Sequence, residues 1–170
     1  YSVMGNHDWW EDGEGMWKAL EEAGITVLEN NAVYVPGEEG GFWLAGMADD
    51  TTKVPDYQLT MEKVKDDLPV IMMAHDPASF RQVEDRPVIT LCGHTHGGQV
   101  VVPYVTSIVA PGRAPLRYSY GHVQERGRDL IVSSGLGTSA VPMRFGRRPE
   151  IVEVIIQGAV SDAPAVSVEH

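Results

Sequence analysis

Short apolar runs alternate with polar turns marked by glycine and proline along the first hundred residues. Apolar positions on one helical face predict a helix over 14–23, which Gly24 ends, and a second helix is predicted over 56–67. Short strands bounded by turn residues are predicted over 1–4, 25–28, 32–35 and 42–46. The continuous apolar runs 70–74 and 88–92 are typical of strands buried on both faces, with a short helix over 77–83 between them.

The chain becomes strand-rich after residue 99. Strands are predicted over 100–102, 116–123, 130–133 and 151–156, and the stretch 134–149 reads as a long loop rich in Gly, Pro and Arg. Helices alternating with strands and followed by further strands predict an α/β fold with layered elements and a mixed sheet. We expect one domain over 1–156 and a flexible tail over 157–170.

Composition narrows the class of partner. The chain has 170 residues, of which 43% are hydrophobic and 22% charged, values of a globular domain. The net charge of −11 argues against an electrostatic grip on nucleic acid or on an anionic membrane surface. A phosphorylated substrate stays compatible with this charge, because a bound cation inverts the charge locally. The single cysteine, Cys92, excludes a disulfide within the chain.

Histidine is concentrated where predicted strands end. Four of the six histidines fall in the segments 5–8, 74–77 and 93–99, which follow the apolar runs ending at Met4, Ala74 and Cys92. Ligands of open α/β sheets bind beyond the carboxyl ends of strands. Three polar clusters at equivalent points of the sheet therefore predict a metal site, since imidazole suits zinc, iron and related cations.

Each cluster also has a simpler interpretation. His94 and His96, two positions apart, point to one side of an extended chain, but they also fit a polar strand end with solvated side chains. Asn6 offers a neutral oxygen ligand, while His7 can face a substrate with Asp8 holding its imidazole; taken alone, these residues fit an ordinary turn better. His75 alone would be a satisfied core histidine. The joint placement favours the metal site.

The same segments resemble the later motifs of the calcineurin-like metallophosphoesterases. The resemblance rests on Gly-Asn-His-Asp at 5–8, Ala-His at 74–75 and Gly-His-Thr-His at 93–96. The segments 135–139, 142–146 and 148–151 are similar to a bacterial branch of YaeI-like or YkuE-like phosphodiesterases, often tethered to the membrane by an N-terminal segment. The resemblance runs from residue 1 to about residue 156. It implies a layered α/β/β/α fold with mixed sheets, here without its N-terminal part.

The resemblance also implies roles for individual side chains. Asn6, His75 and His94 would bind one divalent metal of a binuclear centre, with Mn, Fe or Zn as candidates, and His96 would bind the other. His7 would act on the phosphate or the leaving oxygen, supported by Asp8. Of the arginines in and near the 134–149 loop, only Arg144, inside a matching motif, is favoured to contact a phosphodiester.

The first two motifs of the family, Asp-x-His and Gly-Asp-x-x-Asp, are absent from the sequence. We therefore expect a C-terminal portion whose remaining ligand set is neutral, with at most partial metal occupancy and weak or no activity alone. The intact protein would hydrolyse a phosphodiester or pyrophosphate, with a lipid-linked compound as one candidate, in the bacterial cytoplasm or at its membrane. The alternative is a non-catalytic module that binds or oligomerises. We expect a homo-oligomer, because a partial fold leaves apolar strand faces open.

Overall fold

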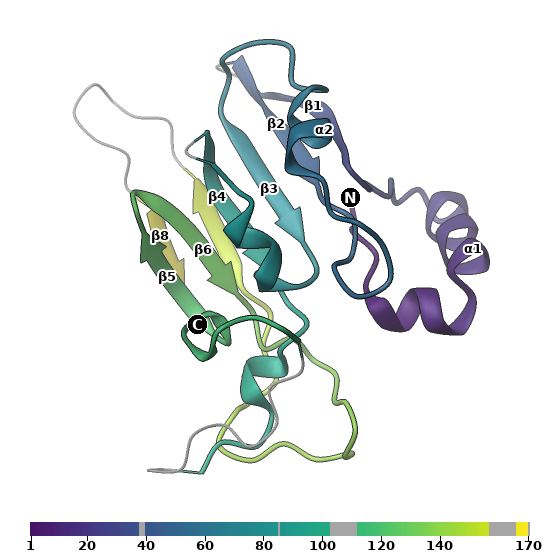
Figure 1. Ribbon diagram of the computed structural model, residues 1–170, viewed down its shortest axis with the longest axis vertical. Coiled ribbons are helices and arrows are strands. Elements are labelled where there is room, and N and C mark those ends of the chain that lie inside the picture. Colours follow the sequence, from purple (N-terminus) through teal and green to yellow (C-terminus); the bar gives the residue numbers. More distant parts are fainter. Residues whose placement is uncertain (38–39, 85, 103–111, 157–165, 170) are drawn as a thin grey trace.

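The centre of the chain is a six-stranded sheet (Figure 1). It is seen in a computed structural model that describes residues 1–37, 40–84, 86–102, 112–156 and 166–169. The strands lie in the order β1-β2-β3-β4-β6-β5. They are β1 (Asn31–Gly37), β2 (Gly40–Gly46), β3 (Val70–Ala74), β4 (Pro87–Cys92), β5 (Gly121–Glu125) and β6 (Arg128–Val132). Neighbours from β2 to β6 run parallel, whereas β1 and β5 are antiparallel edge strands, which confirms the predicted mixed sheet.

Short helices cover one face of this sheet. They are α2 (Tyr57–Met61) and the single-turn elements η1 (Pro77–Arg81) and η3 (Leu116–Tyr118), with η2 (His96–Gly98) at the end of the sheet. Phe80 and Tyr118 pack edge to face with ring centroids 5.6 Å apart, inside a core that includes Met72 and Leu130. Apolar side chains from alternate positions of the central strands therefore fill one layer of core.

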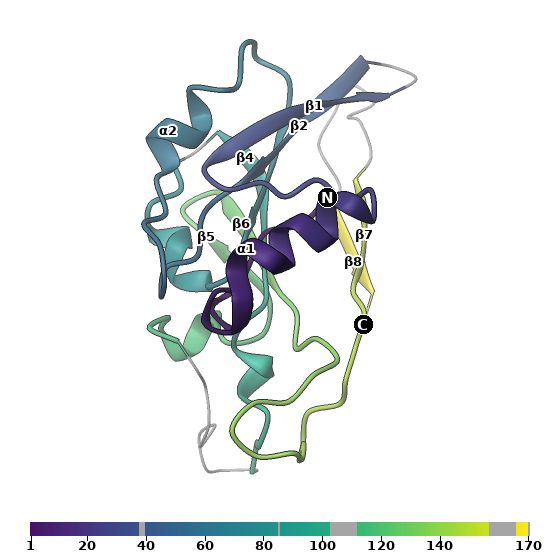
Figure 2. The same ribbon diagram turned by 90° about the vertical axis from the view of Figure 1, so that its right-hand side faces the viewer.

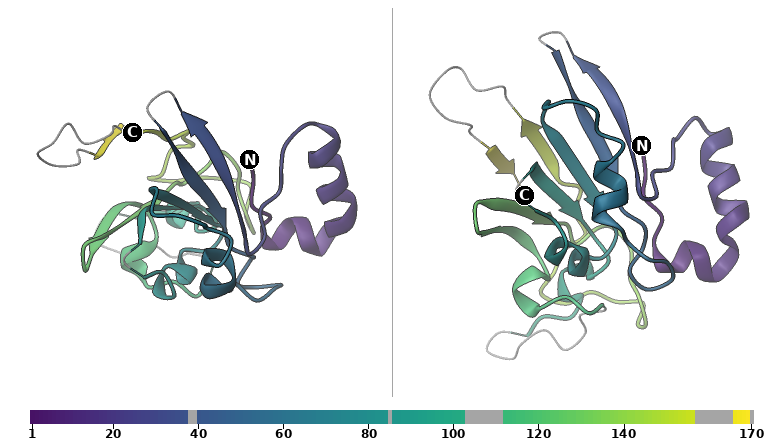
Figure 3. Two further views of the ribbon diagram at one scale, coloured as in Figure 1. Left: turned by 90° about the horizontal axis from the view of Figure 1, so that it is seen from above. Right: turned by 45° about the horizontal axis from the view of Figure 1, so that its top comes forward.

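Helix α1 (Asn6–Glu22) lies beside the sheet and is set apart from it (Figures 1 and 3). The prediction of a helix starting at residue 14 is corrected, because the helix begins at Asn6. Gly5 is extended, and the Asp8 carboxylate accepts a hydrogen bond of 2.8 Å from the Gly5 amide, which closes the first turn. Asp12, with φ −161° and ψ 80°, kinks the helix.

Three other predicted elements are wrong in extent. The helix over 56–67 is only the one turn and a half of α2, and the strand over 116–123 is η3 followed by β5. The predicted strand over 25–28 is reduced to one bridge, between Val27 and Ser2. Of the helices that the structure describes, none combines the length and apolar character required to span a bilayer.

The second face of the sheet is only partly covered. Strands β7 (Glu153–Ile156) and β8 (Val166–Glu169) pair antiparallel on the side opposite α2 (Figure 2). The strand β8 falls in the expected tail 157–170, the rest of which lies outside the described residues. In β3 the alternate residues Ile71 and Met73 are partly exposed, so the prediction of burial on both faces is wrong for this strand.

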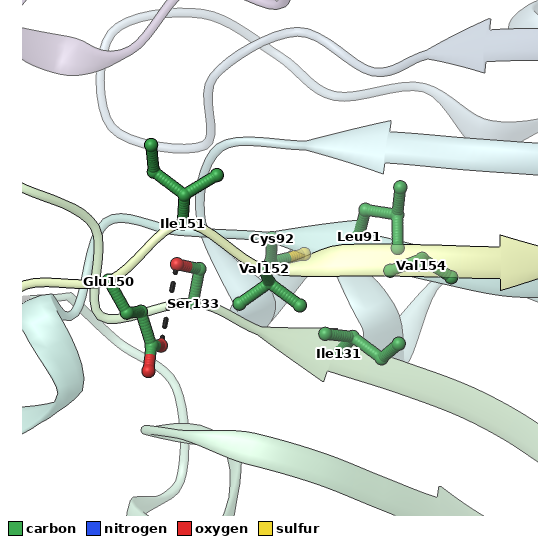
Figure 4. A pocket seen from close by; sticks show the side chains of 8 residues that line it. All are labelled: Leu91, Cys92, Ile131, Ser133, Glu150, Ile151, Val152 and Val154. Atoms are coloured by element: carbon green, nitrogen blue, oxygen red, sulfur yellow. Dashed lines mark hydrogen bonds between the residues drawn. The ribbon is translucent and has the colours of Figure 1, made fainter. Parts of the chain in front are cut away.

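A cavity of about 330 Å³ lies between this second face and the segment leading into β7 (Figure 4). Its lining is mostly aliphatic and contains no histidine: Leu91, Cys92, Ile131, Ser133, Glu150, Ile151, Val152 and Val154. Burial raises the pKa of the Cys92 thiol, so that side chain packs here as a small apolar group. The cavity is separate in chemistry from the histidine cluster described next.

Candidate metal centre

The histidine cluster lies at the carboxyl edge of the parallel strands. His75 directly follows β3, and Gly93 and His94 follow β4, which runs parallel to β3 with Ala74 opposite Cys92. Asn6 arrives from the extended segment that ends at the buried Met4. Parallel pairing of β3 with β4 thus brings His75 and His94 to one edge of the sheet, as the sequence predicted. Asn6 reaches the same point from a segment outside the sheet, which is tied down by an isolated bridge between Ser2 and Val27.

His75 touches two of the other predicted ligands, Asn6 and His94. The Nε2 atom of His75 lies 2.9 Å from Asn6 Oδ1 and 2.8 Å from His94 Nδ1. The two imidazole rings meet edge to face, with centroids 4.6 Å apart. Gly5 makes room for them, because a Cβ at this position would lie 2.6 Å from His75 Cε1. The structure therefore converges two imidazole nitrogens and an amide oxygen at a single buried point.

Backbone strain accompanies this convergence. His94, His96 and Gln99 have φ angles of 65°, 51° and 37°, in the left-handed region that side chains other than glycine seldom adopt. Such conformations cost on the order of 1–3 kcal/mol each and cluster at functional sites. The turn after β4 thus adopts strained backbone conformations that place its side chains, and this strain lowers the free energy of unfolding.

His75 lies among carboxylates. Burial, and next the neighbouring His94, lower the pKa of His75 to about 4, so this ring is neutral at pH 7. Asp49, Asp76 and Asp8 act on this pKa in the opposite direction. A neutral imidazole surrounded by negative charge is the state in which histidine binds a divalent cation.

Two of these carboxylates, Asp49 and Asp76, are site residues to which the sequence pattern assigned no role. Asp49 follows β2 and is fully buried, with Oδ2 held by the Thr52 amide (2.8 Å) and hydroxyl (2.7 Å). Asp76 follows His75 and is 1% exposed, with Oδ1 accepting from the Ala78 amide at 2.7 Å. In the described part of the chain, Asp49 Oδ1 and Asp76 Oδ2 have no hydrogen-bond partner. Their position after strands of the same sheet was the available signal, and they place buried negative charge near a ligand set that is itself neutral.

The pair His7 and Asp8 is arranged differently from its expectation. His7 is exposed and packs edge to face on Trp10 with centroids 5.1 Å apart, while Trp10 is itself 61% exposed. The Asp8 carboxylate bonds the Gly5 amide, and no hydrogen bond between His7 and Asp8 is present in the described structure. The first turn of α1 thus presents His7 to solvent and uses Asp8 to hold the helix start.

His96 stands apart from the three converging donors. Its Nδ1 lies 3.1 Å from the carbonyl oxygen of Gly137, and burial lowers the pKa of its ring. Arg144 locks this arrangement by donating to the carbonyls of Ser134 (2.7 Å), Gly135 (3.2 Å), Gly137 (3.0 Å) and His96 (3.2 Å). The prediction that Arg144 contacts a phosphodiester is therefore corrected, because its guanidinium is committed to backbone oxygens.

The donor set has the chemistry for a borderline cation. Among the described residues, no three His, Cys, Asp or Glu side chains form a group that could hold a metal ion. The candidate set instead consists of two histidines and one asparagine, and N and O donors of this kind suit Zn, Fe and Mn. Asn6, His75 and His94 therefore fit one metal by their donor types and mutual contact, whereas His96 has no second ligand beside it among the described residues.

The lowered pKa of His75 predicts a pH dependence of stability without metal. Above the ordinary histidine pKa of 6.5, the His75 ring is neutral in the folded and in the unfolded chain. As the pH falls below 6.5, the unfolded chain binds the proton first. Stability present above pH 6.5 should decline toward pH 4, by about 2–3 kcal/mol. Urea unfolding of wild type and His75→Gln at several pH values measures this. A difference between the two proteins that stays constant from pH 7 to pH 4 would contradict it.

The chain is similar in sequence to proteins named metallophosphoesterases. It is 34% identical over 152 residues to uncharacterized metallophosphoesterase YkuE of Bacillus subtilis (strain 168), covering 88% of this chain and 53% of that protein. It is 34% identical over 158 residues to phosphodiesterase YaeI of Escherichia coli (strain K12), and this match covers 89% of this chain and 56% of that protein. A Danio rerio transmembrane protein with metallophosphoesterase domain is 31% identical over 173 residues, and this match covers 94% of this chain and 39% of that protein.

These matches span most of this chain but only about half of the first two relatives. No family model matches the sequence. No solved structure matches it either.

Proposed function

Because this chain belongs to the calcineurin-like metallophosphoesterase family, we propose that its site serves metal-dependent hydrolysis of a phosphodiester or pyrophosphate in a longer protein. The observation that carries this proposal is the contact of Asn6 Oδ1, His75 Nε2 and His94 Nδ1 at the carboxyl edge of the sheet. The name of a relative as a phosphodiesterase supports the reaction class. Divalent ions of such centres polarise a phosphoryl group and promote attack by water.

The proposed reaction gives separate roles to the residues that would bind metal and to those that would transfer a proton. Asn6, His75 and His94 hold one metal, with the glycine at position 5 leaving space for the His75 ring. His96 contributes to the second metal, and its ring is oriented by the Gly137 carbonyl. His7, exposed beside the ring of Trp10, protonates the leaving oxygen of the substrate. Asp8 serves this step by fixing the first turn of α1 through the Gly5 amide.

A lipid-linked substrate agrees with the loop beside His96. Leu136, Met143 and Phe145 are 64%, 53% and 53% exposed, on the segment that Arg144 fastens to the His96 carbonyl. Apolar side chains at such exposure next to a polar site suit an acyl or prenyl group. We therefore propose a phosphoester with an apolar tail, used at the cytoplasmic membrane of a bacterium, as the substrate class.

Hydrolysis of bis-p-nitrophenyl phosphate with Mn²⁺ tests the reaction. We expect weak or no turnover from this chain, and metal-dependent turnover from a longer protein that also carries Asp-x-His and Gly-Asp-x-x-Asp motifs. His94→Ala in the longer protein is the control and should remove the activity. Absence of turnover in the longer protein would overturn the proposal that it is an enzyme. That result would favour the alternative, a binding module that retains the fold.

The half-covered face of the sheet predicts self-association of the chain in isolation. Ile71 and Met73 of β3 and Leu91 of β4 are partly exposed on this face, and the outer edge of β1 carries no strand partner among the described residues. Open apolar faces and free strand edges recruit another chain. Sedimentation velocity at micromolar concentration should show a dimer or larger species. A monomer under these conditions would contradict this expectation.

A further inference from the structure

Asp76 lies behind His94, on the side of the ring away from His75. Its Oδ2 atom is 3.5 Å from His94 Nε2, while His94 Nδ1 is the atom that contacts His75. Both side chains are buried, at 7% and 1% side-chain exposure for His94 and Asp76. Asp76 Oδ2 has no hydrogen-bond partner within the described residues. A buried carboxylate oxygen without a donor costs free energy unless a nearby N–H serves it.

The contacts around His75 decide which nitrogen of His94 carries the proton. His75 Nε2 touches the Asn6 carbonyl oxygen, which only accepts, so this nitrogen must carry hydrogen. His94 Nδ1, 2.8 Å from the same nitrogen, is then the acceptor and is bare. With Nδ1 bare, the proton of the His94 ring is on Nε2, which faces Asp76 Oδ2. The contact with His75 sets this tautomer, and it points the N–H of His94 toward the unpartnered oxygen of Asp76, 3.5 Å away.

We propose that Asp76 is a positioning residue that holds His94 in the Nε2–H tautomer and so keeps Nδ1 free as a metal ligand. A ligating histidine usually donates its other N–H to a carboxylate, which fixes the ring and raises its basicity. The metal part of this inference rests on the proposed function, whereas the tautomer does not. Gly112 closes over the pair: a Cβ there would lie 2.7 Å from His94 Cδ2 and 2.9 Å from Asp76 Oδ2.

Asp76→Asn tests this role. Asparagine retains the oxygen that caps the Ala78 amide, but its amide group can donate to His94 Nε2 and so favour a proton on Nδ1. Ring ¹⁵N chemical shifts of the metal-free chain should show His94 protonated on Nε2 in wild type and shifted toward Nδ1–H in the variant. Mn²⁺ affinity by isothermal titration should fall 10–100-fold.

Asp129→Asn is the matched control. Asp129 pairs with His122 Nε2 at 2.6 Å on β5 and β6, so the variant removes a His–Asp contact outside the cluster. It should leave both the His94 shifts and the Mn²⁺ affinity unchanged. Thermal unfolding of both variants reports whether the fold is retained.

The outcomes separate this inference from the proposed function. Wild-type His94 protonated on Nδ1, a result that needs no variant, would overturn the role of Asp76. Unchanged shifts and affinity in Asp76→Asn would overturn it too. Loss of the tautomer in Asp76→Asn, with Mn²⁺ affinity the same in wild type and His94→Ala, would support the positioning of the ring and overturn the metal centre instead.

Discussion

Replacing His75 with alanine should weaken Mn²⁺ binding more than about 100-fold, which is beyond the loss expected for an outer carboxylate. His75 is the member of the cluster that touches both other donors, through one nitrogen, at 2.9 and 2.8 Å. Its removal leaves Asn6 and His94 without a common neighbour and empties the space beside Gly5. Isothermal titration at pH 7.5, where the imidazole is neutral, measures the change.

His122→Ala is the control for that experiment. His122 lies on the edge strand β5 and bonds Asp129, away from the converging donors. We expect its Mn²⁺ affinity to equal that of the wild type. Equal affinity in His75→Ala and wild type, with both proteins folded by circular dichroism, would remove His75 from the ligand set.

Replacing Arg144 with alanine should destabilise the chain by about 3–4 kcal/mol. Hydrogen bonds to a charged group contribute about 1.5–3 kcal/mol each, without full additivity. The guanidinium serves four backbone carbonyls, those of Ser134, Gly135, Gly137 and His96, and joins two segments about 40–50 residues apart. The variant should also release the loop that carries Gly137 and so free the His96 ring. Urea unfolding with the midpoint and slope fitted measures the loss.

Arg148 provides the comparison, because it is exposed and four positions along the same loop. Arg148→Ala should change the free energy of unfolding by less than about 0.5 kcal/mol, as for other surface substitutions. Equal stability of the two variants would show that the carbonyl contacts of Arg144 contribute nothing net.

The sequence was sufficient for the parts of the site that depend on strand order. The apolar runs before His75 and Gly93 predicted strands, and parallel pairing of β3 with β4 follows from the helical segment between them. The meeting of His75 and His94 was therefore predictable from residue spacing and periodicity, whereas Asn6 arrives from a segment outside the sheet. The metal roles of these residues, and those of His7, Asp8 and His96, remain predictions.

What the sequence left out depends on contacts between distant segments. Arg144 looked like a ligand for phosphate because a motif contains it, but its partners are carbonyls brought together by the fold. Asp49 and Asp76 gained importance only when burial left an oxygen of each without a donor. The start of α1 was misplaced because the apolar helical face begins only at Met16, whereas the Asp8 cap stabilises the helix from Asn6.

The most direct test of the central claim is anomalous diffraction from crystals of the chain grown with Mn²⁺, recorded at an energy where manganese scatters anomalously. The account predicts a peak in contact with Asn6 Oδ1, His75 Nε2 and His94 Nδ1, with Asp76 hydrogen-bonded to His94 Nε2. A peak elsewhere, with the three donors still in contact with one another as in the metal-free chain, would contradict it.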